Sequence, residues 1–286
     1  MRNAGDIFKL LLNIARENEQ IRAVLLNGSR ADTTIQQDRF SDYDIVYIVK
    51  ELSSFTGNHN WIDVFGERII LQMPDQMLIP SVRDKTEKYS FGYLMLFKDG
   101  VRIDLTLFPA DKVKDHFDPG SLTVVLLDKD NQFSSLPAAS NNDFIVKKPS
   151  LNEFNDCCNE FWWVSTYIAK GLWRNEITYA KYMMETPVRN MFMQMLEWHA
   201  GVRTGFSVFV GKHGKYLEKY LEPGLWKQVL KTYPDAETEN IWNALLLMTD
   251  IFSQLALVVA NHSAFEYNTV EAMEVKKYLL AIKEQQ

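Results

Sequence analysis

The spacing of apolar residues changes partway along this chain, and that change limits its fold more than any other feature. Before residue 134, short apolar runs alternate with polar turns, as in a β-sheet. A Ser-, Asn- and Pro-rich stretch follows at 134–150, and beyond it apolar residues recur at helical spacing. The sequence therefore predicts an α+β chain, with a mixed β-sheet and flanking helices over residues 1–140 and a helical bundle over 141–286.

The apolar runs of the first part place its elements. Ile7, Leu11 and Ile14 lie at helical spacing, with Asp6 as the expected N-cap. A hairpin is expected to turn at Lys98–Gly100. The predicted strand regions are 21–27, 41–49, 67–73, the hairpin 93–108 and 122–128.

Helix signals mark the second part. Ser150 and Glu153 form a capping-box pattern, and Thr186 followed by Pro187 predicts a second helix start, with the threonine as cap. Further helices are predicted around Trp226 and over 240–260. A length of 286 residues also favours two domains that share a cleft.

Charge and composition exclude several classes of function. The net charge is −6, and acidic side chains outnumber basic ones in both halves, which argues against a nucleic-acid partner. No uninterrupted apolar run reaches the roughly 18 residues of a membrane span, so we expect a cytoplasmic protein. The histidines lack paired ligand spacing, and the adjacent Cys157 and Cys158 are expected to be buried thiols, so no zinc site is predicted.

Three aspartates carry the candidate chemistry. Asp42 and Asp44 alternate along one predicted strand and therefore point to the same face, as Asp104 does on a later strand. A solvated strand edge is the alternative for Asp42 and Asp44 alone. The preceding strand ends at Gly28-Ser29, where backbone N–H groups can approach an anion. Together these residues offer oxygen ligands for Mg²⁺ beside a phosphate site, as in-line phosphoryl transfer requires.

This pattern resembles the polymerase-β-type nucleotidyltransferases. Longer segments, among them residues 28–31, 42–45 and 211–221, are similar to the aminoglycoside 6-adenylyltransferases, which adenylylate streptomycin. The resemblance runs over nearly the full chain. It implies ATP as co-substrate, Mg²⁺, a cationic aminoglycoside as acceptor, antibiotic inactivation, a nucleotidyltransferase domain over residues 1–140 and an acceptor-binding helical domain over residues 141–286.

The resemblance also implies roles for single residues. Asp42 and Asp44 would bind the metal, and Asp104 would be the third carboxylate, which also helps to deprotonate the acceptor hydroxyl. The residues that would grip the triphosphate are Gly28, Ser29 and Arg30. One position departs from the family, because Asn27 stands where a glutamate usually precedes the Gly-Ser pair.

The helical part is expected to supply the acceptor site. Asp156 and Glu160 lie four residues apart on one helix face, and carboxylates bind the guanidinium groups of streptomycin well. Nearby tryptophans offer cation–π walls. A solvated acidic face is the alternative, and Glu160 is also a candidate general base. Lys212 and Lys215 flank a Gly-containing turn and are expected either to bind the outer phosphates or to be ordinary surface lysines.

Two other functions stay open on the sequence alone. One is nucleotidyl transfer to another small molecule or to a protein side chain, and the other is a nucleotide-binding module without turnover. Either a monomer or a homodimer is compatible with the sequence.

Overall fold

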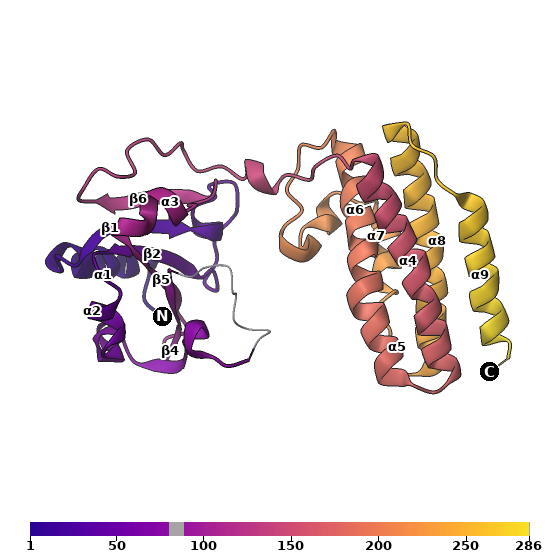
Figure 1. The fold of residues 1–286 in the computed structure, drawn as a ribbon, viewed down its shortest axis with the longest axis horizontal. Coiled ribbons are helices and arrows are strands. Elements are labelled where there is room, and N and C mark those ends of the chain that lie inside the picture. The colour runs from indigo at the N-terminus through magenta and orange to yellow at the C-terminus, as the bar shows by residue number, and fades with distance from the viewer. Residues whose placement is uncertain (80–88, 286) are drawn as a thin grey trace. The chain divides into compact units, whose positions relative to one another are not determined.

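The computed structural model describes residues 1–79 and 89–285 and divides into two compact units, Met1–Asp143 and Phe144–Gln286. The first unit contains a β-sheet with short helices, and the second is built from helices (Figure 1). Each unit has its own buried apolar cluster. The mixed α+β class predicted from the sequence is therefore confirmed.

Strands from the first unit form one mixed sheet in the described residues. Its order is β3-β4-β5-β2-β1-β6, in which β2 and β5 run parallel and the other neighbours run antiparallel. The strands are β1 (Ile21–Asn27), β2 (Tyr43–Val49), β3 (Arg68–Gln72), β4 (Phe91–Phe97), β5 (Arg102–Pro109) and β6 (Thr123–Asp128). All the expected strands are confirmed, and so is the hairpin turn, where the Gly100 N–H donates to the Phe97 carbonyl at 2.8 Å.

Alternation along the central strands separates the two faces of the sheet. On one face, Tyr43, Ile45 and Tyr47 of β2 join the cluster that includes Ile7 and Leu11 of helix α1 (Ala4–Glu17). The opposite face has a smaller apolar cluster. Short helices α2 (Ser53–Thr56) and α3 (Val113–His116) complete this unit, together with 3₁₀ turns at Gly28–Arg30, His59–Phe65, Pro74–Gln76 and Ala110–Lys112.

The N-cap of α1 corrects one prediction. Asn3, not Asp6, is the cap, and its side-chain oxygen accepts from the Asp6 N–H at 2.9 Å. Asn3 has the extended backbone that a cap requires, whereas Asp6 already lies in the first turn. The carboxylate of Asp6 therefore faces the positive end of the helix dipole instead.

The second unit is an assembly of helices. The capping box of Ser150 and Glu153 at the start of α4 is confirmed. The other predicted helices are also found. The elements are α4 (Leu151–Trp173), α5 (Ile177–Met183), α6 (Arg189–Thr204), α7 (Pro223–Leu230), α8 (Thr238–Ser263) and α9 (Thr269–Lys283), with 3₁₀ turns at Asn142–Phe144, Lys212–Gly214 and Leu217–Lys219.

The prediction that a helix begins at Thr186 is wrong. A π-helical segment, Met184–Val188, joins α5 to α6 without a break, so Thr186 is not a cap and Pro187 lies inside the helix. Proline has no N–H to donate and its ring crowds the preceding turn. A widened π turn accommodates this defect without ending the helix.

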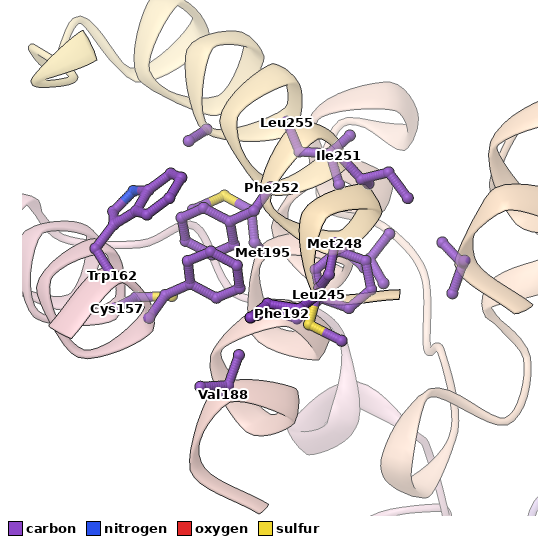
Figure 2. Close-up of a cluster of buried hydrophobic side chains, with 14 of the residues drawn as sticks. Cys157, Trp162, Val188, Phe192, Met195, Leu245, Met248, Ile251, Phe252 and Leu255 are labelled. Atoms are coloured by element: carbon purple, nitrogen blue, oxygen red, sulfur yellow. The ribbon is translucent and has the colours of Figure 1, made fainter. Parts of the chain in front are cut away.

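Large apolar side chains from α4, α6 and α8 fill the core of the helical unit. Figure 2 shows Trp162, Phe192, Met195 and Phe252 within this cluster, and the rings of Phe161 and Phe252 stack at 3.7 Å. Cys157 is buried there as a free thiol, and its neighbour Cys158 is half-buried.

Helix α8 is long and apolar enough to span a membrane by length and composition alone. The expectation from the sequence did not include it, because that expectation counted only uninterrupted apolar runs. In the described structure, residues such as Leu245 and Phe252 of α8 lie in the buried core of the helical unit.

Candidate active site

Three carboxylates meet where β2 and β5 begin. These strands are parallel, so their N-terminal ends lie at the same edge of the sheet, and Asp44 is the direct register partner of Asp104. Asp42 immediately precedes β2. It also lies close to this pair, as the contacts of Arg102 with both Asp42 and Asp104 show. The expectation that Asp42, Asp44 and Asp104 share one region is therefore confirmed.

The face of the sheet explains why these carboxylates are accessible. Asp44 and Asp104 alternate with buried residues and lie on the face of the sheet that does not pack against α1. Val46 and Phe108 lie on the same face, further along the two strands. Among residues 1–79 and 89–285, the apolar cluster on this face lies at that further part. The two carboxylates are half-buried.

Gly28 lies directly against Asp44. It follows β1, whose last residue, Asn27, is paired with Asp44 in the antiparallel register. Gly28 has a φ of +70°, and a Cβ built on it would lie 2.3 Å from Asp44 Oδ2. Any side chain at position 28 would therefore strain the backbone and displace the carboxylate. This position is where the sequence needs glycine.

Arg30 has a structural contact that its place in the sequence did not predict. Its guanidinium donates to the backbone carbonyls of Ser41 and Asp42 at 2.7 and 3.0 Å, and it stacks on the Tyr43 ring at 3.8 Å. These contacts connect the Gly28–Arg30 turn to the start of β2. A contact between Arg30 and triphosphate stays a prediction, as does one for Ser29, which is half-buried in the same turn.

Arg102 forms the closest cationic contact of the carboxylates. Its Nε and one terminal nitrogen donate to both oxygens of Asp104 at 2.8 and 2.7 Å, a bidentate arrangement. Its other terminal nitrogen lies 3.5 Å from Asp42 Oδ2. The sequence predicted no role for Arg102. The alternation of β5, which puts Arg102 on the same face as Asp104, was the available signal.

The crowding of negative charge changes the acidity of the site. Burial, followed by the charges of Asp104 and Asp42, raises the pKa of Asp44 from 3.8 to about 6. Burial also raises the pKa of Asp42, while Arg102 opposes this shift. These directions mean that the cluster favours an added positive charge.

Hard oxygen donors of this kind fit Mg²⁺, which binds through one or two carboxylates together with substrate phosphates. No group of three or more His, Cys, Asp or Glu side chains among residues 1–79 and 89–285 is arranged so that it could hold a metal ion. In this arrangement Asp42 and Asp104 contact Arg102 instead. A metal role for the three aspartates stays a prediction, and oxygens of a bound nucleotide would have to supply further ligands.

The side chain of Asn27 has a hydrogen-bond partner on a neighbouring strand. Its side-chain oxygen accepts from the Thr123 hydroxyl at 3.0 Å, which connects the ends of β1 and β6. A glutamate here would also be an acceptor, but it would add a negative charge next to Asp44. The neutral amide lowers the total negative charge at this end of the sheet.

The two predicted phosphate lysines lie in an unusual turn of the helical unit. Lys212 and Lys215 are exposed, and the turn between them places His213 at φ 55° and Gly214 at φ +72°. The Lys215 ammonium lies 5.0 Å from the centre of the Tyr216 ring. Their role toward phosphate stays a prediction.

The acceptor residues predicted on α4 follow one exposed stripe. Asp156 and Glu160 are both exposed, and Trp163, three residues beyond Glu160, is 61% exposed. Trp173 is exposed too, whereas Trp162 is buried. Only part of the proposed aromatic wall is therefore accessible, and the roles of Asp156 and Glu160 stay predictions.

A groove beside this stripe contains acidic residues that the sequence did not single out. It has a volume of about 540 Å³ and lies between α4 and α9, with Trp162 and Trp163 on one side and Glu271, Glu274 and Tyr278 on the other. About a hundred residues separate its two sides in the sequence. No spacing rule brings them together, so only the packing of α9 on α4 reveals this combination of aromatic and acidic groups.

Known proteins resemble this chain over nearly its whole length. The family described as streptomycin adenylyltransferase matches residues 1–282. The aminoglycoside 6-adenylyltransferase of Campylobacter jejuni is 38% identical over 268 residues, which cover 93% of this chain and 91% of the relative. Those of Bacillus subtilis and Staphylococcus aureus are 36% and 32% identical, covering 93% and 95% of both chains respectively.

A solved structure of an aminoglycoside 6-adenyltransferase from Bacillus subtilis is 34% identical and covers 99% of each chain, with a TM-score of 0.48. The assignment rests on the sequence matches rather than on this superposition. The relatives define the class as adenylyltransferases, for which ATP is the implied co-substrate. The chain belongs to the streptomycin adenylyltransferase family.

Proposed function

We propose that this protein transfers AMP from ATP to a hydroxyl group of streptomycin and so inactivates the antibiotic. The observation that carries the proposal is the meeting of Asp42, Asp44 and Asp104 beside Gly28, within a chain that matches its family over residues 1–282. We further propose that it is a soluble cytoplasmic enzyme that uses Mg²⁺. Residues 1–140 would form its nucleotide domain and residues 141–286 its acceptor domain.

The proposed chemistry divides the work among residues of the sheet unit. The acceptor hydroxyl oxygen forms a bond to the α-phosphorus of ATP, the bond to the bridging oxygen breaks, and pyrophosphate leaves with the bonding electrons. Asp42, Asp44 and Asp104 would hold Mg²⁺, which when bound neutralises phosphate charge and favours attack by the hydroxyl. Asp104 would also accept the hydroxyl proton, and the Gly28–Arg30 turn would bind the triphosphate.

The acceptor is proposed to bind the helical unit through its positive charges. The exposed carboxylates Asp156 and Glu160 can pair with guanidinium groups, and the groove beside them adds Glu271 and Glu274 next to tryptophan rings. Lys170 also lines the groove, but the carboxylates outnumber it, which supports a cationic acceptor over an anionic one. The outer phosphates of ATP are proposed to contact Lys212 and Lys215.

Labelled ATP distinguishes this function from the alternatives. Protein and Mg²⁺ are incubated with streptomycin, with other aminoglycosides or with no acceptor, and the label is followed by chromatography. We expect labelled AMP on streptomycin alone or far ahead of the other drugs. Transfer of label to protein, or ATP binding without turnover, would contradict the proposal and support another acceptor or an inert nucleotide-binding module.

Removing the charge of Asp42 or of Asp44, two of the proposed metal ligands, is the sharpest test of single residues. In Asp42→Asn and Asp44→Asn, we expect transfer to fall by at least about a hundredfold, because each amide is a poorer ligand for a divalent cation. Circular dichroism should show an unchanged fold. Activity close to wild type in either variant would remove that residue from the proposed metal site.

A further inference from the structure

We infer that Arg102 is the resident counter-ion of the three aspartates and that a divalent cation must displace it. Arg102 lies two residues before Asp104 on β5, so both side chains project from the same face of the sheet. Its guanidinium binds both oxygens of Asp104 and lies 3.5 Å from Asp42. The inference rests on the proposed function, since it concerns the same carboxylates.

Two cations cannot share this position without strong repulsion. A divalent ion bound to Asp104 and Asp42 would lie within a few ångströms of the guanidinium, and like charges that close repel strongly where water is partly excluded. Arg102 is able to move, because its side chain is 45% exposed and is not part of the core. Asp104, whose side chain is 19% exposed, stays in place.

The displaced guanidinium needs a new partner, and a triphosphate supplies one. Guanidinium groups bind phosphate oxygens through paired hydrogen bonds, as they bind carboxylates. A metal ion that arrives alone must break the contacts of Arg102 without replacing them. A metal ion that arrives with ATP brings the replacement. Arg102 therefore couples metal binding to nucleotide binding and disfavours metal binding without nucleotide.

Binding of Mn²⁺ to the full-length protein tests this coupling, with paramagnetic resonance of free Mn²⁺ as the readout. Without nucleotide, we expect Arg102→Gln to bind Mn²⁺ about three- to tenfold more tightly than wild type, a range that allows for solvent screening. Arg102→Lys keeps the positive charge but loses the bidentate contact with Asp104. Its affinity for Mn²⁺ should therefore lie between those of wild type and Arg102→Gln. Arg68→Gln is the matched control, since Arg68 lies on β3 and pairs with Asp63.

The same titration with a non-hydrolysable ATP analogue measures the coupling itself. The analogue should strengthen Mn²⁺ binding by a smaller factor in Arg102→Gln than in wild type, because binding free energies are reciprocally linked. Equal Mn²⁺ affinity in wild type and Arg102→Gln, or an equal gain in Arg68→Gln, would overturn the inference.

Asp44→Asn separates failure of the inference from failure of the proposed function. If Asp44→Asn loses Mn²⁺ binding while Arg102→Gln matches wild type, the metal site stands and only the role of Arg102 is wrong. If Mn²⁺ binding is unchanged in Asp44→Asn and also in Asp42→Asn, the metal site itself is wrong and both proposals fail.

Discussion

At the residue scale, the contact between Gly28 and Asp44 controls the geometry of the site. The carboxylate occupies the space that a side chain at position 28 would need. Because Gly28 has no side chain, the turn can lie directly against the carboxylate of Asp44 on β2. A side chain at position 28 would therefore displace the carboxylate of Asp44.

Alanine at position 28 tests that contact. We expect Gly28→Ala to lower transfer by at least about tenfold and the free energy of unfolding by about 1–2 kcal/mol, because it combines backbone strain with displacement of Asp44. Gly120→Ala is the matched control, since Gly120 also has a φ of +70° but a Cβ added there would meet no atom within 4 Å. It should lose less stability, because only the backbone strain applies, and it should keep its activity. Equal activity losses in the two variants would contradict a specific role for the contact.

The raised pKa of Asp44 predicts a dependence of stability on pH. Its folded-state pKa of about 6 lies above the value of 3.8 expected when unfolded, so the folded protein holds this proton more tightly. The resulting stabilisation is complete below about pH 4 and is lost as the pH rises through about 6. At pH 7.5 the wild-type protein therefore carries an unfavourable desolvated charge.

Asp44→Asn should remove that cost. Without divalent cations, we expect the variant to exceed wild type in unfolding free energy by on the order of 2 kcal/mol at pH 7.5, with the gap closing as the pH falls below about 6. Urea denaturation at a series of pH values measures the difference. A gap that does not vary with pH would show that the charge of Asp44 is not its cause.

At the element scale, the capping box of Ser150 and Glu153 fixes where helix α4 begins. Ser150 accepts from the Glu153 N–H, and Glu153 accepts from the Ser150 N–H at 2.8 Å, so the two residues satisfy each other's backbone. Glu153 also has a lowered pKa, chiefly because of the hydrogen bond from the Ser150 backbone. The cap thus holds the start of the helix that carries Asp156 and Glu160.

Loss of this cap should be measurable in denaturation. We expect Ser150→Ala to lower the unfolding free energy by about 1 kcal/mol, as for other serine caps. Glu153→Ala and the double variant complete a cycle in which the two effects should not add, because the residues depend on each other. Additive losses would mean that the reciprocal bonds contribute little.

At the scale of the whole molecule, two compact units divide the proposed tasks. The carboxylates and the Gly28–Arg30 turn belong to the first unit, while Asp156, Glu160 and the α4–α9 groove belong to the second. Apart from the turn with Lys212 and Lys215, which is proposed to contact the outer phosphates from the second unit, the two substrates should protect different parts of the chain. Hydrogen exchange can follow the two units separately.

We expect Mg²⁺ with a non-hydrolysable ATP analogue to slow amide exchange at residues 27–32 and at the starts of β2 and β5. Streptomycin alone should slow exchange in α4 and α9 and leave β2 and β5 unchanged. Mass spectrometry of peptic peptides measures both effects. Protection of the sheet unit by streptomycin alone would contradict the proposed division between the units.

The sequence by itself predicted most of the elements and the candidate reacting groups. Alternation placed Asp42, Asp44 and Asp104 on one face, because side chains of a strand alternate whatever its neighbours are. The capping box of Ser150 was also readable, since its partners lie three residues apart. At α1 the sequence also offered the true cap, because Asn3 lies three residues before Asp6, and Asp6 was the wrong choice. At Thr186 a cap pattern lies inside a π-helical segment that joins two helices.

Only the tertiary structure decided which distant residues meet. The parallel pairing of β2 with β5 sets Asp44 beside Asp104, and the pairing of β1 with β2 sets Gly28 against Asp44. The acids of α9 beside Trp163 follow from packing in the same way. Sequence spacing carries no information on such contacts, because the register of strands and the docking of helices depend on the summed burial of many side chains rather than on any local pattern.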